Sequence, residues 1–334
     1  MFQAYSGLGI VQAAEPEIVL AAWNVENLFD PVDDPDNEGD DAYTPEGWVH
    51  WSENRYRGKL KHLAEVIAEI DPDIICLSEV ENRRVLVDLS SVLASDFNCM
   101  IEEISHRDGE DFRGIDVAVM SKHKPTTKIW FNSVSGQRDV IACRFEIYGR
   151  ELTVIGNHWK SLLGKKARSD AIRTRQAESV RNFIDREIAY NPSAAIVVAG
   201  DFNSDIDSPF LVESAGFSVD FDEVDKAQNT ARLYNLAAGL DKKERATYYY
   251  VRGQRWNSFD SISVTCGMLG MEPKASWQVK PDSYSVYKSP KITFKGLGSP
   301  LPYRRVRSKK YGDRFVAGYS DHFAVFVVLE PGDK

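Results

Sequence analysis

The sequence of 334 residues lacks a run of about 18 uninterrupted apolar residues, so it predicts no membrane span. Only four cysteines are present and none forms a Cys-x-x-Cys pair, which disfavours a thiolate zinc site and favours buried free thiols. No internal repeat and no Ser-, Gly- or Pro-rich linker divides the chain, so we expect a single domain over residues 17–331. Residues 1–16 include small and apolar side chains but no basic start. They are predicted to be an N-terminal arm or the remnant of an export signal.

Positive charge is also scarce. The 41 Lys and Arg residues are outnumbered by 50 Asp and Glu residues, which gives a formal net charge of −9. Proteins that coat nucleic acids rely on an excess of positive charge, so this class is disfavoured. Part of the acidic excess lies in residues 33–41, which lack the alternation of an EF-hand and are predicted to form a solvated loop. Basic residues cluster locally within 160–175 and 304–310.

Apolar periodicity predicts an alternation of strands and helices. A helix is expected over residues 53–70, with Ser52 as its N-cap, a second over 83–93, and a long third helix from about 168 to 189. Residues 274–319 are basic and rich in Pro and Gly, and no helix or strand is predicted in them. Strands are predicted at residues 17–23, 73–79, 98–104, 114–120, 127–131, 140–147, 151–158, 194–200, 247–251, 259–265 and 322–329.

Polar side chains of catalytic type recur where these apolar runs end. Ligand and catalytic groups gather at such positions because the sheet fixes the backbone while the loops leave room for a substrate. One such residue alone is usually a turn or a cap, but six comparable positions in one chain indicate a site. The positions are Trp23-Asn24, Ser78-Glu79, Asn157-His158, Gly200-Asp201-Phe202-Asn203, Phe259-Asp260-Ser261-Ile262 and Tyr319-Ser320-Asp321-His322.

These residue types suit metal-assisted hydrolysis of a phosphoester. Glu79 and Asp321, helped by Asn24, supply the hard oxygen ligands that Mg²⁺ or Mn²⁺ prefers, and one or two ions are expected. Zinc is disfavoured because the histidines lie on distant segments with no His-Glu-x-x-His motif.

The remaining polar residues suit proton transfer and phosphate contact. His158 and His322 are able to hydrogen-bond phosphate or move a proton, with Asp260 as the expected partner of His322. Asp201 and Asn203 are expected to flank the attacked phosphorus, one orienting or deprotonating water and the other donating to the developing charge.

In this order, the segments resemble the endonuclease/exonuclease/phosphatase superfamily with its DNase I-like fold. The resemblance spans residues 23–322, and the set is specific although each piece alone is weak. A bacterial branch whose relatives are often exported is the most similar, which favours export over the cytoplasm. The matching pieces are Trp23-Asn24-Val25-Glu26-Asn27-Leu28-Phe29, Leu77-Ser78-Glu79-Val80-Glu81-Asn82, Gly114-Ile115-Asp116-Val117-Ala118, Gly156-Asn157-His158-Trp159-Lys160-Ser161, Gly200-Asp201-Phe202-Asn203, Phe259-Asp260-Ser261-Ile262 and Tyr319-Ser320-Asp321-His322.

The resemblance implies an α+β fold, a four-layer α/β/β/α sandwich of two mostly antiparallel sheets flanked by helices. It also implies phosphoester hydrolysis with one or two divalent metal ions. Two sets of residues match the family by position. Those that resemble the family's metal-binding residues are Asn24, Glu79 and Asp321. Those that resemble its catalytic residues are His158, Asp201, Asn203, Asp260 and His322. Whether Asp201 or the Asp260–His322 pair activates water stays open at this point.

Three further residues are predicted, on weaker signals, to bind substrate. Lys160 follows His158 by two and shares its face of the strand, and Arg173 lies near the start of the long helix. Asp116 is expected to support His158 or the substrate, or else to make a hydrogen bond at its strand end.

The function that these features favour is a metal-dependent phosphodiesterase, most of all a nuclease acting on DNA or RNA. The alternative is a phosphatase or phosphodiesterase acting on small-molecule, sugar or lipid phosphates with the same site. A non-catalytic module on this fold is a remote alternative, because no member of the site set is missing. No protein partner is inferred.

Overall fold

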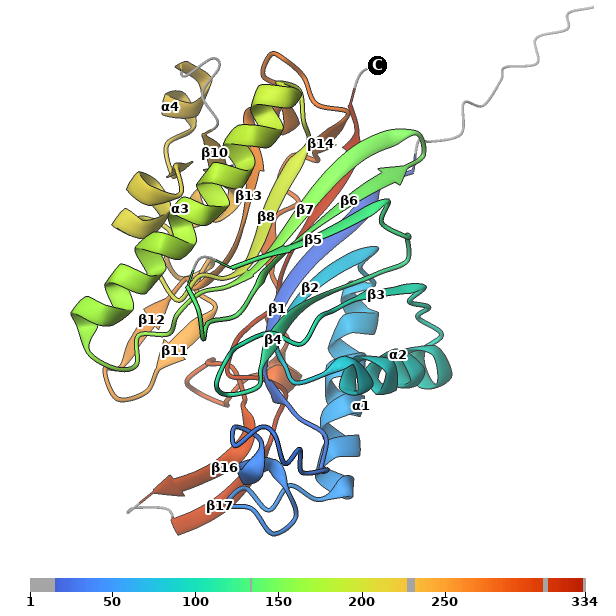
Figure 1. Cartoon of the computed structure of the whole chain (residues 1–334), viewed down its shortest axis with the longest axis vertical. Helices are drawn as coiled ribbons and strands as arrows, with labels where there is room; N and C mark the ends of the chain where they lie inside the picture. The colour runs from blue at the N-terminus through green and yellow to red at the C-terminus, as the bar shows by residue number, and fades with distance from the viewer. Residues whose placement is uncertain (1–15, 133, 227–231, 309–311, 333–334) are drawn as a thin grey trace, which may run out of the picture.

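A computed structural model describes residues 16–132, 134–226, 232–308 and 312–332. The predicted N-terminal arm, apart from Pro16, lies outside the described residues. The described part contains no helix that is long and apolar enough to cross a membrane. Two seven-stranded sheets dominate the fold (Figure 1).

The first sheet is built from both ends of the chain. Its strands are antiparallel except for the parallel pair β1 and β2. In spatial order they are β14 (Trp277–Val279), β18 (Val325–Pro331), β1 (Ile18–Leu28), β2 (Ile74–Val80), β4 (Asp116–Ser121) and β3 (Glu103–Ser105), with β15 (Ser285–Val286) also beside β18.

The second sheet comes from the middle of the chain. It is antiparallel except between β7 and β8 and between β9 and β10. In spatial order its strands are β5 (Thr127–Phe131), β6 (Val140–Ile147), β7 (Arg150–His158), β8 (Ile196–Asp201), β13 (Asp260–Thr265), β10 (Leu233–Asn235) and β9 (Phe217–Ser218).

Helices cover the outer face of each sheet. α1 (Glu53–Ile70) and α2 (Arg83–Phe97) pack on the first sheet, whereas α3 (Lys166–Tyr190) packs on the second (Figure 1). Alternate residues of β1 therefore face opposite layers, with Leu20 in the core between the sheets and Trp23 in the cluster with α1. The predicted four-layer α/β/β/α sandwich is confirmed.

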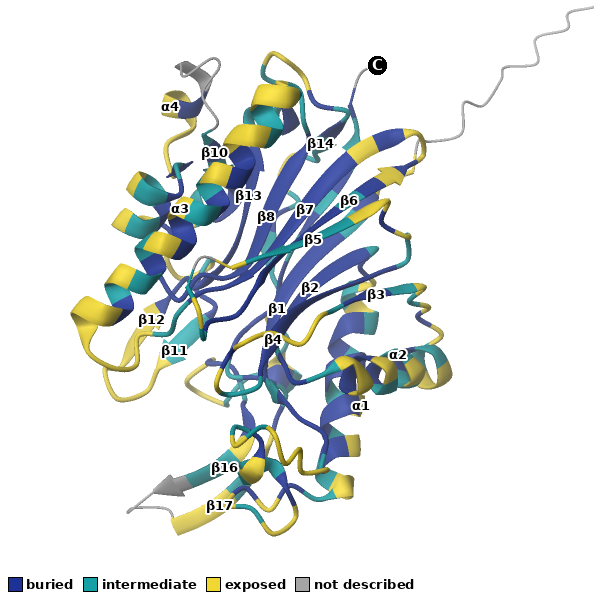
Figure 2. Cartoon of the chain, viewed as in Figure 1, coloured by how far each residue is buried: buried dark blue, intermediate teal, exposed yellow. Residues whose placement is uncertain are grey.

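Burial explains why the strands read as continuous apolar runs. Each sheet is covered on one face by the other sheet and on the opposite face by helices, so both faces of the central strands are buried (Figure 2). Cys76 and Cys143 lie in the core between the sheets, and the four cysteines are free thiols.

The connections contain further short elements. A hairpin of β16 (Tyr303–Ser308) and β17 (Gly312–Ala317) projects from the body (Figure 1). No strand was predicted within residues 274–319, yet this hairpin forms there, because Tyr303 and Phe315 pack against Trp51. A second hairpin joins β11 (Tyr248–Tyr250) and β12 (Arg255–Asn257). The short helix α4 covers Phe221–Lys226, and short helical turns cover Asp41–Tyr43, Phe210–Ser214, Leu236–Gly239, Cys266–Leu269 and Pro290–Ile292.

The two helix N-caps on the first sheet differ, which gives a test of this packing. Asn82 accepts a hydrogen bond from the Val85 N–H at 3.1 Å, whereas Ser52 makes no side-chain cap bond. We expect Asn82→Ala to lower the free energy of unfolding by about 1 kcal/mol, because an N–H in the first turn loses its acceptor. Ser52→Ala is the control and should change it by no more than a few tenths of a kcal/mol. Urea unfolding followed by circular dichroism measures both, and equal effects would contradict the assignment.

Candidate active site

Strand register places the predicted residues in one row. His158 of β7 pairs with Asp201 of β8, and Asp201 pairs in turn with Asp260 of β13. Gly200 precedes Asp201 with φ +138°, and a Cβ there would lie 2.0 Å from the Asn157 carbonyl oxygen. Only glycine permits this close approach, so the Gly-Asp sequence fixes where the aspartate leaves the strand.

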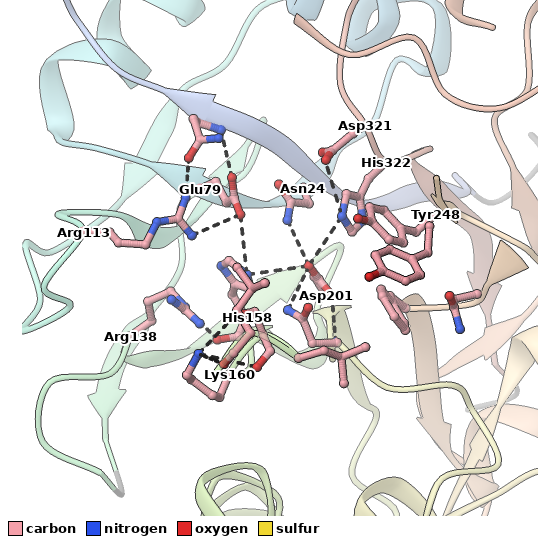
Figure 3. A pocket seen from close by; sticks show the side chains of 18 of the residues that line it. Asn24, Glu79, Arg113, Arg138, His158, Lys160, Asp201, Tyr248, Asp321 and His322 are labelled. Carbon is pink, nitrogen blue, oxygen red and sulfur yellow. Dashed lines mark hydrogen bonds and ion pairs between the residues drawn. The ribbon is translucent and has the colours of Figure 1, made fainter. Parts of the chain in front are cut away.

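The carboxylate of Asp201 is the centre of the site (Figure 3). Its Oδ2 accepts a hydrogen bond from Asn24 Nδ2 at 2.9 Å, which joins the two sheets. Its Oδ1 accepts the backbone N–H of Asn203 at 2.8 Å. His158 and His322 lie on opposite sides, with their Nε2 atoms 3.6 and 4.0 Å from Oδ2. Asp201 itself is 1% exposed, so this carboxylate is held almost entirely by protein groups.

Burial gives these three groups different protonation behaviour. It raises the pKa of Asp201 to about 7, and the Asp260 carboxylate adds to this rise although His322 and Asn24 oppose it. Burial, together with the positive charges of Arg138 and Arg113, holds the pKa of His158 well below its usual range. At neutral pH, His158 is therefore a neutral imidazole.

His322 behaves in the opposite way. Burial alone would lower its pKa, but Asp260 and Asp201 outweigh burial and raise the pKa well above its usual value. Asp260 Oδ2 lies 2.7 Å from His322 Nδ1, which fixes the ring so that Nε2 faces the cavity. The ring of Tyr248 packs against His322 with centroids 4.8 Å apart. The structure thus brings together the predicted Asp–His pair.

Glu79 and Asp321 border the same cavity from the first sheet. Glu79 lies at φ +64°, and its Oε2 accepts the backbone N–H of Asn27 at 3.0 Å. Its Oε1 lies 3.7 Å from Arg113 and 3.9 Å from His158. Asp321 Oδ2 accepts from Arg304 at 2.9 Å, which helps to hold the pKa of Asp321 below its usual value despite burial.

The donor set fits a hard divalent cation. Each of these two carboxylates keeps an oxygen without a short hydrogen bond, and carboxylate oxygens are the ligands that Mg²⁺ and Mn²⁺ prefer. The side chain of Asn24 already makes two hydrogen bonds: its Oδ1 accepts the Glu26 N–H at 3.0 Å and its Nδ2 donates to Asp201. Its Oδ1 has one remaining lone pair for an ion.

A cavity of about 720 Å³ opens over these groups. It is large enough for a drug-sized ligand or a nucleotide. Its walls combine the acidic centre with positive groups and apolar side chains, and the lining comprises Asn24, Asn27, Glu79, Phe112, Arg113, Gln137, Arg138, His158, Lys160, Ser161, Leu162, Leu163, Asp201, Asn203, Tyr248, Tyr250, Arg255, Asn257, Phe259, Arg304, Asp321 and His322.

The three residues expected to bind substrate have different positions. Lys160 lines the cavity, and its Nζ donates to Ser161 Oγ at 3.1 Å. Arg173 lies outside the cavity lining and donates to the Lys160 carbonyl at 3.0 Å, so it supports the backbone there. Asp116 also lies outside the lining, buried beside His106. A role for these residues in substrate binding stays a prediction.

Sequence reasoning missed four charged residues of the site. Arg113 lines the cavity. It directly precedes the Gly114-Ile115-Asp116 motif in the sequence, and this position could have identified it. Arg304 lies in the basic stretch that the sequence showed, and Glu26, 1% exposed and 3.1 Å from Arg304, lies in the first motif. Arg138 gave no sequence signal, yet it is buried and donates to the His158 carbonyl at 3.1 Å.

Apolar side chains stand at the rim of the cavity. Phe112 is 70% exposed and Leu163 is 78% exposed. On the β11–β12 hairpin, Tyr250 lines the cavity and the adjacent Val251 is 68% exposed. An exposed apolar rim beside a polar centre is typical of a surface that contacts a ligand.

Comparison with known proteins gives a family and a fold. The endonuclease/exonuclease/phosphatase family model matches residues 19–331. A comparison with curated proteins gives no match. Similar solved structures share the fold at low sequence identity, which by itself says nothing of substrate.

Three of these structures show the extent of the similarity. Truncated Caenorhabditis elegans TDP2 is 16% identical, with TM-score 0.56 over 94% of this chain and 97% of that one. A Staphylococcus aureus beta toxin mutant with bound magnesium ions is 14% identical, with TM-score 0.56 over 95% and 100%. D. rerio TDP2 complexed with a single-strand DNA product is 15% identical, with TM-score 0.54 over 94% and 99%. With the family match and the shared fold, the chain belongs to the endonuclease/exonuclease/phosphatase family, whose enzymes hydrolyse phosphoesters and use divalent metal ions.

Proposed function

We propose that the protein is a divalent-metal-dependent phosphodiester hydrolase, and specifically a nuclease that cleaves DNA or RNA by in-line attack of water on phosphorus. The observation that carries this proposal is the position of the Asp201 carboxylate at the floor of the cavity, with the Nε2 atoms of His158 and His322 at 3.6 and 4.0 Å from its Oδ2. One group able to accept a proton beside another able to donate one is what hydrolysis of a phosphodiester needs.

Asp201 is the proposed base. A pKa of about 7 leaves a large ionised fraction at neutral pH and still gives the carboxylate enough basicity to take a proton from water. Asn24 and Asn203 hold the carboxylate in one orientation. We therefore assign water activation to Asp201 rather than to the Asp260–His322 pair, because His322 is already protonated and has no free lone pair for this purpose.

The two histidines are the proposed phosphate contacts. Protonated His322 donates from Nε2 to a phosphate oxygen or to the departing oxygen, and Asp260 holds its charge. Neutral His158 donates a hydrogen bond from Nε2 without adding charge. Glu79, Asp321 and Asn24 are the proposed holders of one or two Mg²⁺ or Mn²⁺ ions. When bound, such an ion supplies positive charge to the developing negative charge on the phosphate oxygens.

Nucleic acid is the favoured substrate because of the cavity walls. Lys160, Arg113 and Arg304 line the cavity and provide positive charge for a polyanionic backbone despite the net charge of −9. The exposed rings of Phe112 and Tyr250 provide surfaces on which a base can stack. The DNA product in the D. rerio TDP2 structure supports this choice of substrate, and the magnesium ions in the beta toxin structure support the proposed metal.

A second candidate is a phosphodiesterase that acts on lipid phosphates. The exposed Val251 and Leu163 favour it, because aliphatic side chains beside the cavity suit an acyl chain better than a base. A panel of substrates with Mg²⁺ or Mn²⁺ separates the two candidates. Cleavage of supercoiled plasmid or single-stranded RNA supports the nuclease, whereas release of a headgroup from phosphatidylcholine vesicles with both polymers intact supports the lipid enzyme. Cleavage of bis(p-nitrophenyl) phosphate alone contradicts both.

Removal of the carboxylate charge at position 79 tests the metal site. We expect Glu79→Gln to lower kcat/KM by at least about 100-fold at fixed Mg²⁺, because a neutral amide is a poor ligand for a hard cation. EDTA should abolish wild-type activity, and added Mg²⁺ or Mn²⁺ should restore it. Glu46→Gln, at an exposed glutamate, is the matched control and should match the wild type. Wild-type turnover in Glu79→Gln would overturn the assignment.

Removal of the aspartate behind His322 tests the histidine pair. We expect Asp260→Asn to lower kcat by about 100-fold or more, because His322 loses the charge that keeps it protonated and oriented. Initial rates on bis(p-nitrophenyl) phosphate at saturating Mg²⁺ measure the effect. Asp282→Asn, at an exposed aspartate, should have no effect. Equal rates in the two variants would show that the pair has no catalytic role.

A further inference from the structure

Two carboxylates hold Arg304 at the wall of the active-site cavity. Its Nε lies 3.1 Å from Glu26 Oε1, and its Nη1 donates to Asp321 Oδ2 at 2.9 Å. The side chain lines the cavity and is 44% exposed. We propose that Arg304 is a further catalytic residue whose guanidinium donates hydrogen bonds to the phosphate group under attack. This inference rests on the proposed hydrolysis of a phosphodiester.

Glu26 fixes both the backbone and the side chain at this position. Its Oε2 accepts the backbone N–H of Tyr303 at 2.7 Å, while its Oε1 faces the Arg304 guanidinium. Tyr303 is itself anchored, because its hydroxyl donates to the Arg55 carbonyl at 2.7 Å and its ring packs edge-on against Trp51. A donor that is held in place before the substrate arrives needs little reorganisation, and such donors are the effective ones in catalysis.

The guanidinium keeps donor capacity for a ligand. An arginine side chain carries five N–H groups, and the contacts with Glu26 and Asp321 involve only Nε and Nη1. Within the parts of the chain that the structure describes, Nη2 of Arg304 makes no hydrogen bond. The planar fork of an arginine matches the oxygens of a phosphate, so Arg304 can bind one while both carboxylates keep it in place.

A buried lysine supplies these carboxylates with a second positive charge. Lys59 is 0% exposed, and its Nζ donates to the Tyr319 carbonyl at 2.7 Å, two residues before Asp321. Burial lowers the pKa of Lys59 to about 8, although the charges of Glu26 and Asp321 oppose this change. The carboxylates therefore have a counter-charge inside the protein, and the exposed part of Arg304 is left for the substrate.

Two other arginines of the cavity are less suited to this role. Arg138 is buried, and its three nitrogens donate to Asp111 and to two backbone carbonyls. Arg113 lies 3.7 Å from Glu79, which is too long for a hydrogen bond. Of these three arginines, Arg304 alone combines two close carboxylates with donors that face the cavity.

Replacement of Arg304 separates a catalytic contact from a structural one. We expect Arg304→Met to lower kcat on bis(p-nitrophenyl) phosphate by at least about 100-fold at saturating Mg²⁺, because a donor to the developing charge is lost. The same variant should bind Mn²⁺ about fivefold more tightly, since a positive charge beside Asp321 is gone. Electron paramagnetic resonance of unbound Mn²⁺ measures this affinity without substrate. A merely structural role would weaken activity and metal binding together.

Two matched variants complete the test. Arg305→Met lies next along β16 and outside the cavity lining, so it should keep the wild-type kcat and Mn²⁺ affinity. Arg304→Lys keeps the charge but not the planar fork, so we expect kcat at least about 10-fold below that of the wild type, with unchanged Mn²⁺ affinity. If circular dichroism shows that Arg304→Met does not fold, Arg304→Lys decides alone.

The possible failures are distinguishable. Wild-type kcat in the deciding Arg304 variant, with activity lost in Glu79→Gln, would overturn this inference and leave the proposed function intact. Weaker Mn²⁺ binding by Arg304→Met would also overturn it, because Arg304 would then serve only to hold Asp321. A wild-type protein that hydrolyses no phosphodiester would overturn the proposed function, and this inference with it.

Discussion

The structure depends on one buried carboxylate at the seam between two sheets. Asp201 ends a strand of the second sheet and accepts a hydrogen bond from Asn24 of the first, so this interaction links the edges of both layers at the candidate site. A buried carboxylate is tolerated only when its oxygens are satisfied, and here amide and backbone donors satisfy them. The same burial raises the pKa of Asp201 to about 7, which suits the proposed role of this carboxylate as the base. Both the stability of the fold and the proposed chemistry thus require the Asp201 carboxylate to be buried and hydrogen-bonded.

Strand register sets the spacing of the residues in the candidate site. Because His158, Asp201 and Asp260 occupy paired positions on three neighbouring strands, their relative spacing is set by backbone hydrogen bonds and not by loops. Loops then add the positive side chain of Arg113 and the apolar rim around the cavity. With the proposed reacting groups fixed by the sheets and the walls supplied by loops, one fold can host different functions.

Much of this was predictable from the sequence, for physical reasons. Helix α1 has the predicted bounds, because its apolar stripe and its Asp-Pro stop are local signals. The fold and the convergence of strand ends followed from motif order, and the structure places all eight predicted catalytic and metal residues in or beside the cavity. The hairpin of β16 and β17 was missed because its strands depend on packing against Trp51, a distant contact. Arg138 was missed because only tertiary structure brings its guanidinium to the His158 carbonyl.

The proposed metal site is the part of the account on which the chemistry depends, and crystals soaked in Mn²⁺ test it most directly. The anomalous signal of manganese locates the ion without any assumption about substrate. The account predicts a peak inside the cavity at about 2.0 to 2.3 Å from a carboxylate oxygen of Glu79. A manganese peak confined to the acidic segment around Asp40, with none beside Glu79 or Asp321, would contradict it.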